Sequence, residues 1–325
     1  MFNHPNIDKP IMIAFILVEG FSLLPFISAT EPLRMANRIA NKELFKRAYF
    51  SEKGEAVLAG NGIEIQTVGS VKDLHEYPNL FITGGFEPLV KTPRWLIDIL
   101  KSRSRSGAMI GALGTGTYHV ARAGLLDGKK ATVHWEYAAS FAEEFPRTQV
   151  TSSLYEISTN RITCSGGIAA MDMMTHLISQ HTNPLLATAV SDTFIHGRVR
   201  TARDVQKVLI PGDGEHTPLE LRAAISIMQR RNDSRINIHE IARELGVSSR
   251  HLSRLFQRHV GKSPLAFANQ LRLQRAQSYV LHSNLGFQEL AELAGFTSSS
   301  AFSRAYKQNF GIAPYTHRTT IIANR

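Results

Sequence analysis

The stretch Ala108–Thr117, AMIGALGTGT, decides the fold of the first part of this 325-residue chain. A short apolar run, typical of a buried strand, stops at Gly114-Thr115-Gly116-Thr117, and a segment with helical character follows. A strand, a sharp turn and a helix start place backbone N–H groups at the tip of the turn. We identify the tip as Gly114, which has no side chain, so we do not expect nucleophilic attack from this position.

Other strands are predicted on both sides of this turn. Ile11–Val18 is a continuous apolar run, as expected for a strand buried on both faces. Leu80–Thr83 stops at two glycines, Arg161–Thr163 precedes the helical pattern Ile168–Ser179, and another strand is expected to end at Val133–Glu136. Strands that alternate with helices in this way predict an open parallel α/β sheet over about the first 200 residues.

Ligands of such sheets lie beyond the carboxyl ends of the strands. The loops Glu19–Phe21, Gly84–Glu87, Gly114–Thr117 and His134–Glu136 are all predicted at that edge. Each alone is as typical of an ordinary turn or a packed strand end, but together they favour a small-molecule pocket, in which an aromatic face suits a cation. The candidate ligand-binding residues are Phe21, Gly85, Phe86, Gly114, Thr115, Thr117, His134, Trp135 and Glu136.

Several classes of protein are disfavoured by the same residues. The glycines around Gly114 do not have the G-x-G-x-x-G spacing of a dinucleotide site, so no cofactor is expected. The single cysteine, Cys164, provides neither a disulfide nor a cysteine-based zinc site, and we expect no metal. No apolar run approaches the roughly 20 residues of a membrane span, and the first ten residues do not have the pattern of a signal peptide. We therefore expect a cytoplasmic protein with no membrane partner.

Three segments of this first part resemble a known domain: EPLRMANR, GTGTYHVARAGLLDGKKATVHWE and ITCSGGIAAMDMMTHLI. They are similar to the amidase-like sensor domain of GlxA-type AraC-family regulators, over roughly residues 10 to 200. That domain is similar to class I glutamine amidotransferases and PfpI peptidases, and the resemblance implies a flavodoxin-like fold. Enzymatic relatives have a cysteine at the elbow, where this chain has Gly114, which argues against inherited hydrolase activity.

The positive charge of the chain is concentrated in its last third. Residues 1–216 contain 22 Lys and Arg against 21 Asp and Glu, whereas residues 217–325 contain 15 against 6. A basic part attached to a nearly neutral one suggests a polyanion as the partner of the basic part. We expect residues 1–208 to form a sensing and dimerisation domain, 209–218 a linker with two prolines and two glycines, and 219–325 a DNA-binding domain.

Within the basic part, the same helical pattern occurs twice. A short amphipathic helix at Ile238–Leu245 is followed by a turn and by a second helix that begins after Ser248. Phe287–Ala294 and Ser298–Asn309 repeat this arrangement, and a long helix, Pro264–His282, lies between the two. Two such helix-turn-helix motifs can place two recognition helices in successive major grooves, roughly 34 Å apart. The partner predicted for this all-α region is double-stranded DNA.

About 100 residues of this region, including AFSRAYKQNFGIAPYTHR, resemble the AraC/XylS DNA-binding domain. By position within that domain, the base-edge readers are Arg250, Ser253 and Arg254 in the first motif and Ser300, Ala301 and Arg304 in the second. Ser249 and Lys307 complete the expected DNA-binding set. Arginine suits bidentate contact with guanine, and we expect at least one of the three arginines to read a base while the others contact phosphate.

We therefore expect a ligand-responsive transcriptional regulator in which a small effector alters how domains or subunits engage DNA and RNA polymerase. The resemblance implies a homodimer, and it implies activation of genes of amino acid or quaternary-amine metabolism, with arginine, glycine betaine or carnitine as the type of effector. Two alternatives stay open at this point. The first domain could be an amidohydrolase that uses Cys164 or a water activated by His134, or it could serve only for dimerisation.

Overall fold

The computed structural model describes residues 1–3, 9–85, 92–204, 206, 217–230, 236–283 and 285–323. The chain divides into two compact units, Met1–Gln206 and Lys207–Arg325. Most of the predicted linker, residues 209–216, lies outside the described residues. No helix in the described ranges is long and apolar enough to cross a membrane.

The first unit is built on a seven-stranded sheet with the order β10-β11-β7-β6-β1-β2-β5. Its strands are β1 (Ile11–Ile16), β2 (Phe45–Ser51), β5 (Gly69–Ser70), β6 (Asn79–Thr83), β7 (Met109–Leu113), β10 (Tyr155–Ile157) and β11 (Arg161–Cys164). All neighbours pair in parallel except β10 and β11, which are antiparallel. The predicted open parallel α/β sheet is therefore confirmed.

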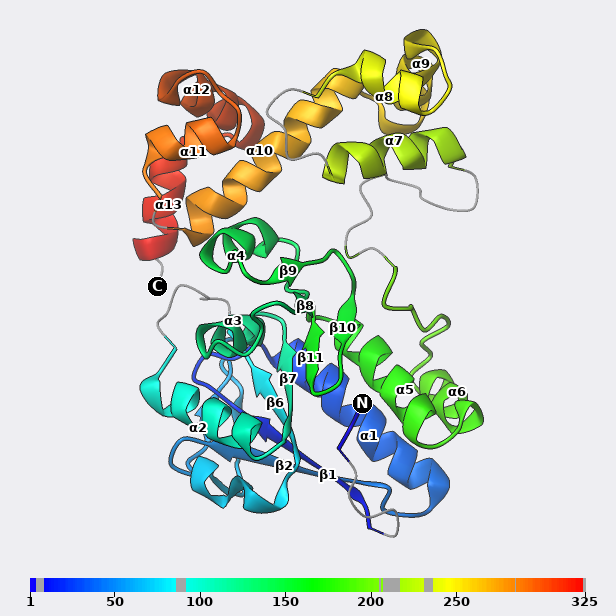
Figure 1. Ribbon diagram of the computed structural model, residues 1–325, viewed down its shortest axis with the longest axis vertical. Helices are drawn as coiled ribbons and strands as arrows, with labels where there is room; N and C mark the ends of the chain where they lie inside the picture. The colour runs from blue at the N-terminus through cyan, green and yellow to red at the C-terminus, as the bar shows by residue number, and fades with distance from the viewer. Residues whose placement is uncertain are drawn as a thin grey trace. The chain divides into compact units, whose positions relative to one another are not determined.

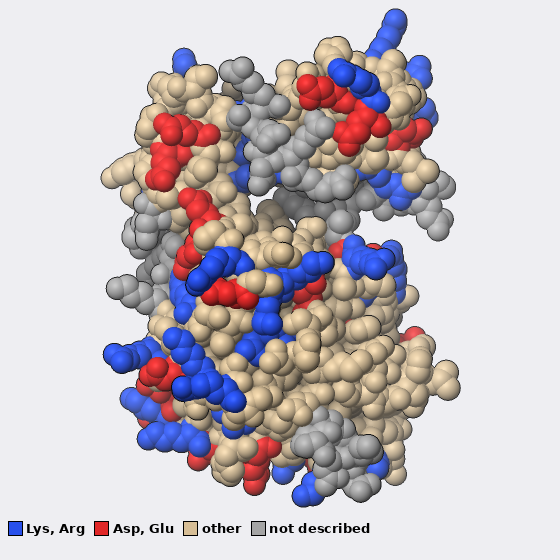
Figure 2. Space-filling model, in the orientation of Figure 1, with Lys and Arg blue, Asp and Glu red and all other residues tan. Residues whose placement is uncertain are grey.

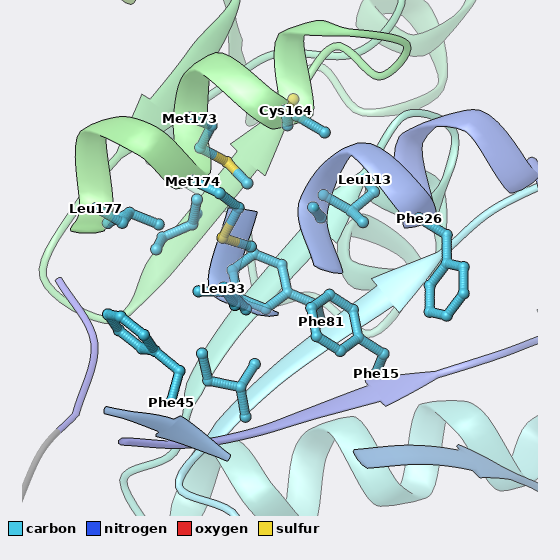
Figure 3. Close-up of a cluster of buried hydrophobic side chains, with 14 of the residues drawn as sticks. Phe15, Phe26, Leu33, Phe45, Phe81, Leu113, Cys164, Met173, Met174 and Leu177 are labelled. Carbon is cyan, nitrogen blue, oxygen red and sulfur yellow. The ribbon is translucent and has the colours of Figure 1, made fainter. Parts of the chain in front are cut away.

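Helices cover both faces of this sheet (Figure 1). The α-helices of the unit are α1 (Leu23–Ala40), α2 (Arg94–Arg105), α3 (Gly116–Arg122), α4 (Ala138–Glu144), α5 (Ala169–His181) and α6 (Pro184–Thr193), and a 3-10 helix, η1, spans Val71–Glu76. One apolar cluster joins the sheet to α1, α5 and α6, and a second joins it to α2, α3 and α4. Figure 3 shows the first cluster, in which Phe15 and Phe81 of the sheet lie close to Met174 of α5.

The strand β1 shows why apolar runs in the sequence predicted buried strands correctly. Ile13 and Phe15 belong to one cluster while Ala14 and Ile16 belong to the other, and all four are buried. A strand buried on both faces needs an unbroken apolar sequence, whereas a half-exposed strand alternates. The same double burial explains the apolar segments at β6 and β7, whose five residues each are buried.

The prediction of a strand that ends at Val133–Glu136 is wrong in its extent. The observed strand, β8 (Lys130–Ala131), pairs only with β9 (Gln149–Val150) in a separate two-stranded sheet, and residues 135–137 form a turn before α4. Beyond Ala131 the buried Thr132 does not continue the backbone pairing of β8, because its N–H donates to the side chain of Thr163 in β11 at 2.9 Å and its hydroxyl donates to the carbonyl of Ser153 at 2.7 Å. A further small antiparallel pair joins β3 (Val57–Leu58) to β4 (Glu64–Ile65).

The second unit is helical throughout its described elements. It contains α7 (Leu219–Arg230), α8 (Ile238–Glu244), α9 (Ser249–Val260), α10 (Pro264–His282), α11 (Phe287–Leu293), α12 (Ser299–Phe310) and α13 (Pro314–Ala323). The long helix α10 contributes its first half to an apolar cluster with α7, α8 and α9, and its second half to another with α11 and α12 (Figure 1). The predicted tandem arrangement, with one long helix between two short pairs, is confirmed.

Candidate functional site

The predicted strand-turn-helix elbow is present. β7 ends at Leu113, α3 begins at Gly116, and Gly114 between them has a φ of +57°, in the left-handed region. The Gly114 N–H donates to the carbonyl of Cys164 at 2.9 Å. A Cβ built at Gly114 would meet Gly166 Cα at 3.8 Å, which is ordinary contact, so the tip has room for a small side chain. The elbow geometry is therefore intact while its tip has no reactive group.

Three of the four loops predicted at the carboxyl edge meet there. Phe21 and Gly85 form an isolated bridge, and the hydroxyl of Thr115 donates to the carbonyl of Gly85. A Cβ on Gly84 would lie 2.1 Å from the backbone nitrogen of Gly116, so only glycine fits at that crossing. These groups satisfy one another, and the loops consequently form a packed junction.

The remaining predicted residues of this edge are placed differently. Phe21 is fully buried, with its ring centroid 5.5 Å from that of Phe26. Thr117 is also fully buried, and its hydroxyl donates to the carbonyl of Thr132 at 3.2 Å. Phe86, with Glu87 after it, lies outside the described residues.

A cavity of about 360 Å³ lies beside the elbow, at the start of α5. This volume is within the range of small-molecule sites, roughly 300–1,000 Å³. Of the predicted ligand-binding residues that the structure describes, His134 and Trp135 line it and the other six do not. Among the described residues, the lining is His134, Trp135, Leu154, Ser165, Gly166, Gly167, Ile168, Ala169, His196, Arg200 and Gln206.

The turn before α4 supplies the aromatic wall of the cavity. The rings of His134 and Trp135 lie 5.4 Å apart, and Trp135 is 38% exposed. Glu136 lies next to them, with its Oε2 3.5 Å from His134 Nδ1. An indole face next to a carboxylate is an arrangement that attracts cations, including quaternary ammonium groups.

Another part of the lining, His196 and Arg200, comes from a segment that sequence reasoning missed. We call residues 196–204 the strap. This segment has no helix or strand, and hydrogen bonds to the buried Asp172 attach it to α5. Asp172 accepts hydrogen bonds from His196 Nε2 at 2.9 Å, from the Arg200 N–H at 2.7 Å and from Arg200 Nε and Nη2 at 3.0 and 2.7 Å. The only signal in the sequence was a carboxylate within the apolar helix AAMDMMTHLI, which requires a buried partner.

The chemistry available to a hydrolase is limited here. Cys164 is fully buried among apolar side chains, and this burial raises the pKa of its thiol to about 12 (Figure 3). A thiol with that pKa is protonated at neutral pH and is a poor nucleophile. Among the described residues no group of three or more His, Cys, Asp and Glu side chains is arranged to hold a metal ion.

The first helix-turn-helix motif of the second unit is formed by α8 and α9. Ser248 caps α9, since its Oγ accepts the N–H of His251 at 3.1 Å. Leu252 and Phe256 are buried on the inner face of α9. The predicted readers Arg250, Ser253 and Arg254 are exposed, and Ser249 is partly exposed.

The second motif, α11 and α12, repeats this geometry. Ser298 caps α12 by accepting the N–H of Ala301 at 3.2 Å, and Phe302 and Tyr306 are buried on its inner face. The predicted residues Ser300, Arg304 and Lys307 are exposed, and Ala301 is partly exposed. Both turns contain a glycine in the left-handed region, Gly246 with a φ of +68° and Gly295 with a φ of +69°.

The comparisons with known proteins agree with both halves of this description. The DJ-1/PfpI family matches residues 12–180, and a helix-turn-helix domain matches residues 241–320. The chain is 36% identical to the HTH-type transcriptional regulator CdhR of Pseudomonas aeruginosa over 307 residues, covering 94% of this chain and 91% of the relative. It is 32% identical to the HTH-type transcriptional regulator GlxA of Rhizobium meliloti over 304 residues, covering 93% and 94%. The chain belongs to the GlxA-type AraC-family transcriptional regulators.

A solved structure supports the fold of the first unit of this AraC-family regulator. The crystal structure of an AraC family transcriptional regulator from Pseudomonas putida matches with 29% identity and a TM-score of 0.53, over 57% of this chain and all of that one. The resemblance inferred from the sequence is thereby confirmed, both for the DJ-1/PfpI-type domain and for the AraC-type helices.

Not all of the positive charge in the DNA-binding unit faces outward. Arg272 of α10 donates to the carbonyls of Ala294 and Gly295 at 2.9 and 3.0 Å and lies 4.6 Å from the ring centroid of Phe296. Arg318 of α13 donates to the carbonyl of Val280 at 2.8 Å. Burial lowers the pKa of both guanidinium groups. These arginines stabilise the helix packing. Fewer positive charges are therefore available to DNA phosphates than the net charge of this AraC-type unit suggests.

Lysine and arginine side chains are also visible on the first unit (Figure 2). Many of them there have acidic neighbours, as Arg122 does in its ion pair with Glu144 at 2.9 Å. No ion pair within 4.0 Å is found for Arg250, Arg254 or Arg304 among the residues that the structure describes. The exposed arginines of α9 and α12 are therefore available to a polyanion.

Proposed function

We propose that this AraC-family regulator is controlled by a small nitrogen-containing effector, an amino acid or a betaine-like quaternary amine, that occupies the cavity beside Trp135. The observation that carries the proposal is a cavity of small-molecule size with an indole face and a nearby carboxylate, in a domain whose elbow has no nucleophile. A cation over an indole contributes about 0.5–2 kcal/mol of binding free energy.

The buried thiol favours sensing over amide hydrolysis. An amidohydrolase would need an accessible thiolate or a base next to a nucleophile, whereas Cys164 is buried and Gly114 has no side chain. His134 is half-exposed and lies beside Glu136, which suits a binding wall as well as a base. We therefore expect the purified protein to show no turnover of glutamine or other amides.

On DNA, we infer that α9 and α12 enter successive major grooves. The exposed Arg250 and Arg254 of α9 and Arg304 of α12 are the side chains able to make bidentate contacts with guanine, and Ser253, Ser300 and Ala301 offer more permissive contacts. We expect Ser249 and Lys307 to complete the DNA-contacting set. We further infer a homodimer formed through the first domain, which activates genes of amino acid or quaternary-amine metabolism by engaging RNA polymerase.

Calorimetric titration tests the effector class directly. The full-length protein is titrated with glycine betaine, carnitine and arginine, and with sucrose as an uncharged reference. We expect at least one of the three to bind, and Trp135→Leu to weaken that binding about 2- to 30-fold, which corresponds to the cation contribution above. Trp95→Leu is the matched control, because Trp95 lies on α2 and does not line the cavity. Absence of heat with all three compounds, from protein that still binds DNA, would refute the proposed effector class.

A further inference from the structure

Arg200 is a charged residue of the strap that also lines the cavity. Its side chain is 34% exposed and lines the cavity, while the carboxylate that it contacts, Asp172, is fully buried. Its Nε and Nη2 both donate to Asp172 Oδ2. Asp172 thus engages Nε and Nη2 of the guanidinium, and Nη1 is not used in this pair.

The positive side of the cavity is reinforced by the start of α5. Gly167 and Ala169 line the cavity at the N-terminus of this 13-residue helix, where the helix dipole favours negative charge, although the N–H groups of Ala169 and Ala170 already donate to the carbonyls of Gly166 and Gly167. Trp135 lines the same cavity. The cavity therefore combines an indole, which suits a cation, with a guanidinium, which suits an anion.

The strap is held by polar contacts more than by packing. A second cavity, of about 730 Å³, lies along it and is lined by Val199, Arg200, Thr201, Ala202 and Arg203 together with residues of β10, α5 and α6. Arg200 lines both cavities. A segment with open space beside it and few buried apolar contacts is more easily shifted than one embedded in a core.

We propose that Arg200 binds the carboxylate of the effector and that the strap carries cavity occupancy toward the DNA-binding unit. This inference rests on the proposed effector cavity and specifies its ligand as a zwitterion, with a cationic nitrogen at Trp135 and a carboxylate at Arg200. The chain runs from the strap through Gln206, whose amide donates to Thr132 Oγ1 at 2.8 Å, and the second unit begins at Lys207.

The ligand adds to the Arg200–Asp172 pair and does not replace it. Withdrawing the guanidinium would leave a fully buried carboxylate without its charged partner, which is strongly destabilising. A carboxylate in the cavity instead uses the free edge of Arg200, in the fork geometry that arginine offers to carboxylates. Occupancy consequently tightens the strap against α5.

Paired probes test this recognition. Glycine betaine and choline differ by a carboxylate, as do arginine and agmatine, and acetate is the smallest carboxylate probe. Binding is followed by the fluorescence of Trp135 in a full-length Trp95→Phe background, because these are the two tryptophans of the chain. We expect each carboxylate to bind about 10- to 100-fold more tightly than its partner, and acetate to bind weakly but saturably, with chloride as the ionic-strength control.

The variants separate recognition from folding. Arg200→Gln removes the preference for carboxylates, whereas Arg198→Gln, on the same strap but outside the cavity lining, retains it. If circular dichroism shows that Arg200→Gln is unfolded, Arg200→Lys takes its place, with an expected loss of about tenfold. Hydrogen exchange at the Arg200 N–H, which donates to Asp172, slows when a carboxylate binds to the wild-type protein.

The outcomes distinguish the two proposals. Equal binding of choline and glycine betaine, or of agmatine and arginine, overturns the role of Arg200 and leaves the cation site intact. Saturable acetate binding that Arg200→Gln abolishes supports the role of Arg200 even if no nitrogen compound binds, which would refute the proposed effector class alone. Absence of binding by every probe, acetate included, overturns both.

Discussion

Replacing Gly114 by alanine tests whether this position requires glycine because of its backbone conformation and not because a side chain would clash. The φ of +57° costs an ordinary residue about 1–2 kcal/mol. The new Cβ would meet only Gly166 Cα at 3.8 Å and Ser165 O at 4.0 Å, so no clash is added. We therefore expect Gly114→Ala to lower the free energy of unfolding of the first unit by about 1–2 kcal/mol.

Gly116→Ala is the matched control two residues away. Its Cβ would lie 2.4 Å from the backbone oxygen of Ile82, which cannot move aside, so we expect a loss of about 3 kcal/mol or more. Urea denaturation followed by tryptophan fluorescence reports on the first unit, since Trp95 and Trp135 both lie there. If Gly114→Ala is as damaging as Gly116→Ala, or has no effect, the argument from backbone strain is refuted.

Three other predictions concern groups that the structure places in defined environments. Burial holds the pKa of His119 down at about 4, against 6.5 in an unfolded chain. Its stabilising contribution is complete above pH 6.5 and falls by up to about 3 kcal/mol as the pH drops toward 4, because the unfolded chain binds the proton first; His119→Gln should flatten that limb of a denaturation profile. The Cys164 thiol should react with an aromatic disulfide reagent at pH 7.5 only as fast as the first unit opens, and rapid labelling of folded protein would contradict its pKa of about 12. Arg254→Ala should weaken specific DNA binding by about 1–3 kcal/mol and relax one operator position, whereas Arg258→Ala should lower only the salt dependence; an unchanged preference at every position in an anisotropy assay would assign Arg254 to the backbone.

The elements that the sequence predicted best are those whose signals are local. The β1 strand is apolar because both of its faces are buried, and α9 and α12 each begin at a serine cap and bury two large side chains one turn apart. Cap chemistry and helical periodicity are properties of a few neighbouring residues, so they can be read without a structure. The repeat of the pattern then indicated the tandem motif.

The cavity was predictable only in part, because its walls come from distant segments. Trp135 was found as an unexplained aromatic at a presumed strand end, although that strand stops at Ala131. Arg200 and Gln206 were missed, since the sequence around them shows no clear helical or strand period. Their positions depend on Asp172, whose burial inside α5 follows from tertiary packing. A charged residue inside an apolar helix is therefore a signal to search for a remote basic partner.

The position of the cavity relative to the elbow explains how a catalytic type of domain can serve regulation. At the elbow itself the Gly114 N–H donates to the carbonyl of Cys164 and the Thr115 hydroxyl donates to that of Gly85, so removal of a nucleophile leaves little to bind a ligand there. The open space lies beside the elbow, and its lining includes Arg200 and Gln206 from the last part of the first unit. A ligand shifts a conformational equilibrium only by its difference in affinity for the two states. The contact to Arg200 that we propose would supply such a difference if it forms only when the strap is tight, and the coupling needed for a 5- to 150-fold response is about 1–3 kcal/mol, the size of one charged hydrogen bond.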